Sequence, residues 1–175
     1  LRFSTLIPLL KPGGAIRPLA IPDVFRRISA SSLCAQHRTD FAAVLAPCSL
    51  AVGVSAGTEV FAKAVRIQAE RTPLWYFAKI DGTNAYCTTP RHDSAAVILH
   101  YFPAMYRFFS AWYSRESTYL YFSDAPLAEL VHTSSGWDQG DPFAPCGFSL
   151  VLLPIIQAAR TRILALLPSA RRPFH

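Results

Sequence analysis

The chain has 175 residues and a formal net charge of +6, with an isoelectric point near 9.4. Hydrophobic residues make up 51% of it and charged residues only 16%, which excludes an intrinsically disordered chain and predicts a folded core. The positive charge favours partners that carry phosphate, because the release of counterions from a nucleic acid drives binding. An ordinary basic surface with no such partner would give the same net charge.

The ends and the cysteines set further expectations. The chain starts with Leu and its single methionine is Met105, which predicts a start inside a longer reading frame, so we treat both ends as possible cuts. No signal peptide is visible at the N-terminus. The four cysteines form no Cys-x-x-Cys pair, which argues against a zinc site or a thioredoxin-like motif. We expect reduced, partly buried cysteines in an intracellular protein, nuclear or cytoplasmic.

Local signals predict short strands alternating with helices. A Lys-Pro-Gly-Gly turn between two strand-like runs predicts a hairpin, and Asp23 and the Thr89-Pro90 pair mark helix starts. The expected elements, in chain order, are strands over 5–10 and 17–21, a helix from Asp23 toward Pro47 with a break, a helix over 58–71, a strand over 74–81, helices over 89–101 and 105–112, a hairpin of 117–122 with 129–133, and a long apolar helix from Pro142 to Ala159. The fold class is mixed α/β (α+β), with a mixed or antiparallel sheet and packed helices.

The apolar helix expected over residues 142–159 carries no formal charge, so its length alone would suit a membrane span. Four residues within it, Pro145, Gly147, Pro154 and Gln157, make it a poor span. We therefore expect a buried core helix and no membrane partner.

Two short motifs carry the most chemical information. Asp81 ends an apolar, β-prone run, so a strand would hold its carboxylate at an open end, where oxygen ligands suit Mg²⁺. A turn-capping Asp is the simpler alternative. The second motif, Gln139-Gly140, lies in a glycine-rich turn before the apolar helix, and such a turn brings backbone close to a ligand. We expect the two motifs to converge on one nucleotide pocket.

In this order the motifs resemble the palm of a reverse transcriptase of the non-LTR retrotransposon type. Asp81 with Ala85 and Tyr86 is similar to the first palm motif of that family, and Gln-Gly-Asp-Pro at 139–142 is similar to the second. Upstream, the turn at 11–14 with Arg-Pro-Leu at 17–19 resembles the fingers hairpin. Gly-Val at 53–54 and Gly-Thr-Glu at 57–59 resemble the segment between fingers and palm. The resemblance extends from about residue 6 to about residue 159.

The resemblance implies an RNA-directed DNA polymerase, a nucleotidyltransferase that adds deoxynucleotides to a DNA primer on an RNA template with two Mg²⁺ ions. Residues 1–72 would be a fingers-like region and residues 73–175 a partial palm of one continuous domain. The residues that would carry the chemistry are Asp81 as catalytic acid and metal ligand, Tyr86 as the gate against the 2′-hydroxyl, Lys11 and Arg17 as triphosphate ligands, and Gln139 with Gly140 against the incoming nucleotide and template.

Three departures from the family matter, and the first is that Gly82 and Thr83 follow the acid where bulkier residues are frequent. Asp138 stands where the family usually has Gln or Arg, which would place a negative charge beside the nucleotide site. The third palm motif, an aromatic-x-Asp-Asp hairpin, is absent, since no residue after Asp141 is acidic. Tyr-Phe-Ser-Asp at 121–124 precedes the glycine turn and is not that motif. This chain is therefore expected to be an incomplete or inactive polymerase core. Arg26 or Arg27 could contact template phosphate, but a solvated helix face is the simpler interpretation.

Two alternatives stay open. Gly-Val-Ser-Ala-Gly at 53–57 matches the nucleophile elbow of α/β-hydrolases, with Ser55 as nucleophile and Asp93 or Asp124 with His132 in the required order. Short patterns of this kind recur by chance. The other alternative is a catalytically inactive reverse-transcriptase remnant that binds nucleic acid.

Overall fold

Two β-hairpins from opposite halves of the chain combine into one four-stranded sheet. The computed structural model describes residues 3–72, 77–123 and 127–166. The strands are β1 (Phe3–Leu10), β2 (Ile16–Pro22), β3 (Ser117–Tyr121) and β4 (Glu129–Thr133). β1 pairs antiparallel with β2 and β3 pairs antiparallel with β4, which confirms both predicted hairpins.

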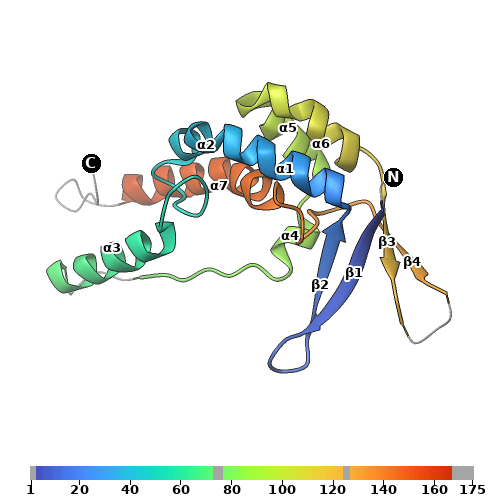
Figure 1. The fold of residues 1–175 in the computed structure, drawn as a ribbon. Helices are drawn as coiled ribbons and strands as arrows, with labels where there is room; N and C mark the ends of the chain where they lie inside the picture. The colour runs from blue at the N-terminus through green and yellow to red at the C-terminus, as the bar shows by residue number, and fades with distance from the viewer. Residues whose placement is uncertain (1–2, 73–76, 124–126, 167–175) are drawn as a thin grey trace.

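The two hairpins meet through a parallel pairing of β1 with β3. Phe3 lies opposite Thr118 and Leu6 opposite Tyr121, so the strand order is β2-β1-β3-β4. The sheet is therefore mixed, and it joins residues 1–72 to residues 73–175 by backbone hydrogen bonds. Figure 1 shows the sheet descending from one end of the helical part of the molecule.

Helices form the rest of the described structure. They are α1 (Val24–Gln36), α2 (Arg38–Leu45), α3 (Gly57–Arg71), α4 (Ala85–Thr88), α5 (Arg91–Tyr101), the 3-10 turn η1 (Pro103–Met105), α6 (Tyr106–Tyr113) and α7 (Ala144–Leu166). Figure 1 shows α7 running along α1 and α2, with α5 and α6 above them, while α3 stands to one side. The fold is thus mixed α+β, as predicted.

The predicted helix starts are right at one position and wrong at another. The Asp23 carboxylate accepts hydrogen bonds from the backbone N–H groups of Phe25 and Arg26, so it caps α1. The expected break in that helix falls at His37, between α1 and α2. Thr89, in contrast, is no cap: its hydroxyl donates to the Ala85 carbonyl at 2.7 Å, and α5 starts after Pro90.

The hydrophobic core lies between α7 and the helices that cover it. Its buried side chains come from α1, α2, α5, η1, α6, α7 and the turn before α7, and include Ala30, Phe41, Leu45, Ile98, Met105, Phe109, Phe143 and Leu150. The Trp137 ring packs among three aromatic rings, those of Phe109, Tyr113 and Phe143. The core is thus an aromatic cluster closed by the first turns of α7.

The long apolar helix is a core helix over only part of its length. Its buried residues are Ala144, Cys146, Gly147, Leu150 and Leu153, whereas Ile155 is 61% and Leu166 84% exposed. The expectation of a buried helix over 142–159 is therefore wrong for its second half. By length and hydropathy α7 could cross a membrane, but a core helix passes the same test, so this is weak support for a span.

The strand expected over residues 74–81 is the clearest error. Residues 74–76 lie outside the described part of the chain, and residues 77–82 form neither strand nor helix. Ile80 is 94% exposed and Phe77 is 53% exposed, so neither side chain is packed in the hydrophobic core. A β-prone segment forms a strand only where it can pair with a neighbouring strand and bury one face. The sheet consists of β2, β1, β3 and β4, and residues 77–82 pair with none of them.

We predict that Gly147→Ala destabilises the protein by about 1–3 kcal/mol, because a Cβ at this position would lie 2.2 Å from the Trp137 ring. On an exposed helix the same change would stabilise, since Ala is the better helix former. Urea unfolding followed by circular dichroism measures the difference. Adding Trp137→Phe should recover part of the loss, and a Gly147→Ala variant as stable as the parent would contradict this packing.

Candidate functional site

The glycine-rich turn before α7 is built onto the segment that follows Asp81. The Gly136 N–H donates to the Thr89 carbonyl at 2.9 Å, and the Trp137 N–H donates to the Tyr86 carbonyl at 2.8 Å. A Cβ on Gly136 would lie 2.3 Å from the Cys87 carbonyl oxygen, and its φ is +76°. Only glycine fits both demands. The segment after Asp81 and the glycine turn therefore touch through backbone at α4.

The same turn also contacts the first hairpin. The Gly140 N–H donates to the Ala20 carbonyl on β2 at 2.9 Å, and a Cβ on Gly140 would lie 2.5 Å from that oxygen. The glycine of the Gln-Gly pair is therefore required by its close approach to β2. As a result, β2, α4 and the turn meet at one place, although they are far apart in the sequence.

A cavity of about 170 Å³ lies where these three segments meet. Its walls are mostly apolar and come from the inner face of the sheet, α4 and the turn: Leu6, Pro18, Ala20, Cys87, Tyr119, Val131, Thr133, Ser135, Trp137 and Gln139. The Gln139 amide donates to the Cys87 thiol at 3.5 Å. The cavity is smaller than the about 300–1,000 Å³ of typical ligand sites, so it has room for only part of a ligand.

Behind the turn lies a buried ionic cluster of Arg26, Asp138 and Asp141. The Arg26 guanidinium, 2% exposed as a residue, donates to Asp138 Oδ2 at 3.0 Å and to Asp141 Oδ2 at 2.6 Å. Both carboxylate side chains are fully buried. The cluster thus carries one more negative than positive charge, and buried charge must be compensated by hydrogen bonds.

Hydroxyl groups supply that compensation. Tyr119 donates to Asp138 Oδ1 at 2.7 Å, and Ser4 donates to Asp138 Oδ2 at 3.1 Å. Tyr113 donates to Asp141 Oδ2 at 2.8 Å, while Asp141 Oδ1 accepts from the backbone N–H of Phe143 just before α7. Strands β1 and β3, helix α6 and the turn are thereby tied to one another.

The ionisation of the cluster follows from its burial. Burial raises the pKa of the Tyr113 phenol, and the neighbouring Asp141 and Asp138 charges raise it further. Burial and Asp138 likewise raise the pKa of Tyr119, so both phenols stay protonated donors at neutral pH. Burial alone would lower the pKa of Arg26, but the negative charges around it, including those of Asp141 and Asp138, more than offset this and raise it. The guanidinium therefore stays charged.

This cluster corrects two expectations. Asp138 does not place a free negative charge beside a nucleotide site, because its carboxylate is buried and paired. Arg26 is not on a solvated helix face and cannot reach a template phosphate, whereas its neighbour Arg27 is exposed. Sequence reasoning missed Arg26, Tyr113 and Tyr119 as a group. One signal was present: Arg26 shares a helical face with Ala30, at the i, i+4 spacing of a packed face.

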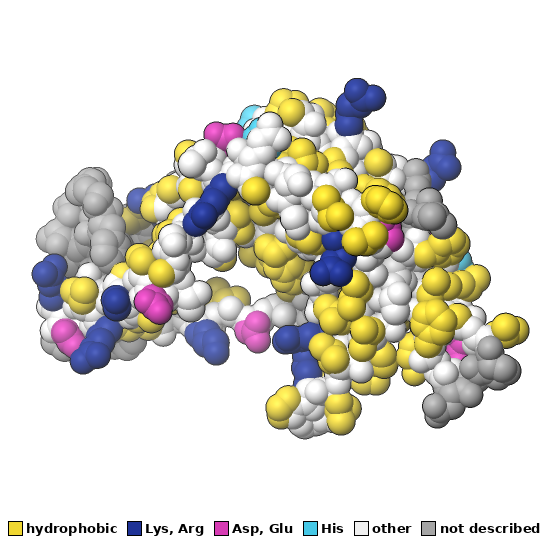
Figure 2. Space-filling view, in the orientation of Figure 1, with side chains coloured by type: hydrophobic (Ala, Val, Ile, Leu, Met, Phe, Trp, Pro, Cys, Tyr) yellow, Lys and Arg dark blue, Asp and Glu magenta, His cyan; other side chains and the backbone are white. Residues whose placement is uncertain are grey.

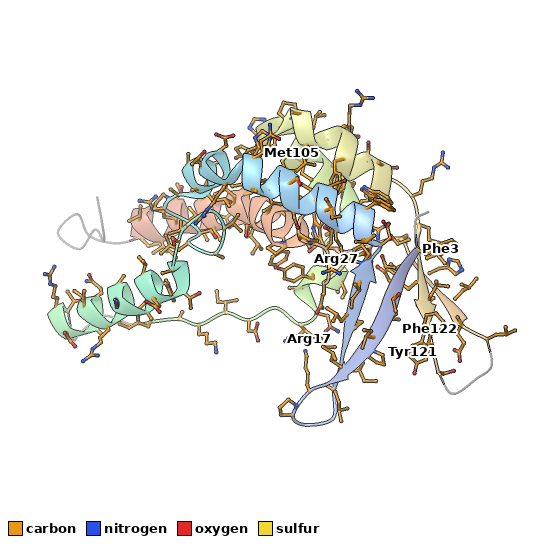
Figure 3. The ribbon with its side chains drawn as sticks, in the orientation of Figure 1. Phe3, Arg17, Arg27, Met105, Tyr121 and Phe122 are labelled. Carbon is orange, nitrogen blue, oxygen red and sulfur yellow. The ribbon has the colours of Figure 1, made fainter. Side chains whose placement is uncertain are left out.

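The predicted charged site residues lie at the surface. Asp81 is exposed in the segment before α4, and Arg17 is exposed on β2, with Lys11 half-exposed at the start of the turn. Figure 3 shows Arg17 projecting from the hairpin. Across the part of the chain that the structure describes, no group of three or more His, Cys, Asp or Glu side chains could hold a metal. Cys87, in the segment after Asp81, lines the cavity with Gln139, whereas the exposed Asp81 carboxylate does not line it.

The aromatic residue of the first motif packs against α7. The rings of Tyr86 and Phe148 are stacked, with centroids 4.6 Å apart and an interplanar angle of 23°. Burial raises the pKa of the Tyr86 phenol, so it stays protonated at neutral pH. Tyr86 is half-buried, and one face of its ring is therefore already occupied.

The serine of the Gly-Val-Ser-Ala-Gly pattern is not in a nucleophile elbow. An elbow follows a strand, whereas the residues before Gly53 form turns and bends after α2. Ser55 is exposed, and His132, the histidine it would need, contacts Glu116 and Thr118 at the β3–β4 hairpin. The hydrolase interpretation therefore lacks both the fold and the base.

Comparison with known proteins adds no family assignment. A scan against protein-family models and a search of curated proteins each found no match for this chain.

We predict that Arg26→Ala lowers the free energy of unfolding by about 3–5 kcal/mol, because it leaves two buried carboxylates without their cation. Arg27→Ala, one residue along on the exposed face, is the matched control and should change it by less than about 0.5 kcal/mol. Urea unfolding at neutral pH measures both. Equal effects of the two substitutions would show that the cluster is not buried as described.

Proposed function

We propose that this chain is the fingers and partial palm of an RNA-directed DNA polymerase of the non-LTR reverse transcriptase type. The observation that supports the proposal most is the meeting of the three motif-bearing segments around one cavity. Ala20 comes from the hairpin of Lys11 and Arg17, Cys87 follows the Asp81 motif, and Gln139 comes from the glycine turn. A nucleotide site assembled from fingers, palm and turn requires such a meeting.

The distribution of charge is compatible with a nucleotide at this place. Lys11 and Arg17 are the only charged residues of the described part of the β1–β2 hairpin, and both are cations. Lys79 and Asp81 are the only charged residues of the described segment before α4. Figure 2 shows the surface hollowed between this segment and the helical part of the molecule, with the hairpin at one end of the hollow and cationic and acidic side chains at its margins. Cations beside one carboxylate suit a metal-bound triphosphate.

In this proposal each residue has a limited task. Mg²⁺ would neutralise charge on the phosphates, and Asp81 would supply one of its oxygen ligands. Arg17 and Lys11 would hold the triphosphate, and Gln139 with Gly140 would lie against the incoming nucleotide and the template. Tyr86 would crowd the sugar, with its ring held in place by Phe148. One carboxylate binds Mg²⁺ weakly, so the phosphates themselves would have to complete the coordination.

A second candidate function is an inactive remnant that binds an RNA template and DNA primer without catalysis. The specific observation in its favour is that the described residues include no group of three or more His, Cys, Asp or Glu side chains, around Asp81 or elsewhere, that could hold metal ions. Basic composition would still support salt-dependent binding of nucleic acid.

We predict that the chain binds an RNA template annealed to a chain-terminated DNA primer, and that Mg²⁺ with the complementary deoxynucleotide triphosphate tightens this complex several-fold. A non-complementary triphosphate should have no such effect, because only a templated pair fits the site. Fluorescence anisotropy of a labelled primer measures both. Arg17→Ala should raise the triphosphate concentration needed for this tightening about tenfold, the size expected for loss of a charged hydrogen bond.

Arg107→Ala removes an exposed arginine on α6, remote from the hairpin, and is the control of equal charge. It should leave the triphosphate effect unchanged while reducing general binding slightly. Binding of the primer-template without discrimination between triphosphates would favour the remnant. Failure to bind any primer-template at low salt would reject both candidates.

We also predict that, in a longer chain that includes an aromatic-x-Asp-Asp segment, Asp81→Asn lowers primer extension at least about a hundredfold, because it removes metal-bound charge stabilisation. Thermal unfolding should be unchanged, since Asp81 is exposed. Asp93→Asn on α5 is the matched control and should keep full extension. Extension that survives Asp81→Asn would remove this residue from the site.

A further inference from the structure

Two cysteines from distant parts of the chain are in contact beside the ionic cluster. Cys34 lies near the end of α1 and Cys146 in the first turn of α7. The Cys146 thiol donates to the Cys34 sulfur at 3.6 Å, which is van der Waals contact between the two sulfur atoms. Cys34 is half-buried, so solvent can reach it, whereas Cys146 is 5% exposed.

The surrounding structure holds these two thiols together. Arg26 on α1 is bound to Asp141 just before α7, so the two helices cannot separate without breaking a buried ion pair. The Cys34 thiol also donates to the Pro142 carbonyl at 3.6 Å. Sulfur atoms in contact need only side-chain rotation and a small approach to reach bonding distance, provided that the helices stay in place.

We propose that Cys34 and Cys146 form a reversible disulfide site that links α1 to α7. The oxidant is a low-molecular-weight disulfide of the glutathione class. The proposal does not depend on the function proposed above, because it rests on the contact between two thiols and not on a nucleotide.

The reaction proceeds by two thiol–disulfide exchanges. Cys34 loses its proton to solvent, and its thiolate attacks the oxidant, forming a mixed disulfide and releasing one thiolate. The Cys146 sulfur then attacks the Cys34 sulfur, and its proton goes to the second departing thiolate. In sum, two protein thiols become one disulfide and the oxidant becomes two thiols.

The local environment assigns the first step to Cys34. The hydrogen bond donated by Cys146 lowers the pKa of the Cys34 thiol, although burial opposes this. The pKa of Cys146 is raised, first by that same hydrogen bond and then by burial. The thiol that is easier to ionise is thus also the one that solvent reaches, as an attacking cysteine requires.

A bond at this position would have a structural consequence. The positions it joins are 112 residues apart, and a closed loop of that size restricts the unfolded chain strongly. It would also fix α1 against the start of α7, next to the turn that carries Gln139. Oxidation would therefore stabilise the fold and limit movement of that turn.

The test is oxidation of the folded chain with oxidised glutathione, followed by trypsin digestion without reduction and mass spectrometry. Each cysteine lies in a different tryptic peptide, with Cys34 in 28–38, Cys48 in 39–63, Cys87 in 80–91 and Cys146 in 116–160. We expect a linked 28–38/116–160 peptide that disappears on reduction with dithiothreitol. Thermal unfolding of the oxidised protein should shift upward by about 10 °C.

Two variants make the result specific. Cys48→Ser with Cys87→Ser should leave both the linked peptide and the thermal shift intact. Cys34→Ser should abolish both, and circular dichroism would confirm that it is folded. Links that involve Cys48 or Cys87, or stable glutathione adducts on Cys34 without the linked peptide, would overturn the proposal.

Discussion

The buried pairing of Arg26 with Asp138 and Asp141 is the interaction on which the rest of the structure depends. It joins α1 to the turn before α7, and the phenols of Tyr113 and Tyr119 extend it to α6 and β3. Removing the partner of a buried charge strongly destabilises a protein. We therefore expect these elements to keep one relative arrangement and to unfold together. The position of the glycine turn, and with it the cavity, follows from this constraint.

The candidate site is a consequence of close backbone packing rather than of converging acidic side chains. Gly136 and Gly140 allow the turn to approach α4 and β2 closely, which brings the three motif-bearing segments to one cavity. Asp81 remains exposed outside that packing. The arrangement is compatible with nucleotide recognition by a polymerase, and it leaves the metal-binding part of such a site with a single described carboxylate.

Two predictions failed where the conformation or burial favoured by a segment needed neighbouring elements that the fold does not provide. Residues 77–81 are β-prone, but the sheet is complete without them, and Ile80 is left in solvent. The apolar character of α7 predicted burial throughout, but the surrounding helices cover only its first turns. The contact of Tyr86 with Phe148 was not predicted either, because spacing in the sequence does not show it.

The sequence by itself determined the local elements, namely the first hairpin with its glycine turn and the start of α1 at Asp23. These follow from backbone geometry and from hydrogen bonds between near neighbours. Only the tertiary structure decided that Arg26 is buried, that the Asp138 carboxylate is paired with it, and that Cys34 contacts Cys146. Each of these depends on a partner more than 100 residues away in the sequence. The presence of a charged residue or a cysteine in a sequence does not show whether such a partner will bury it.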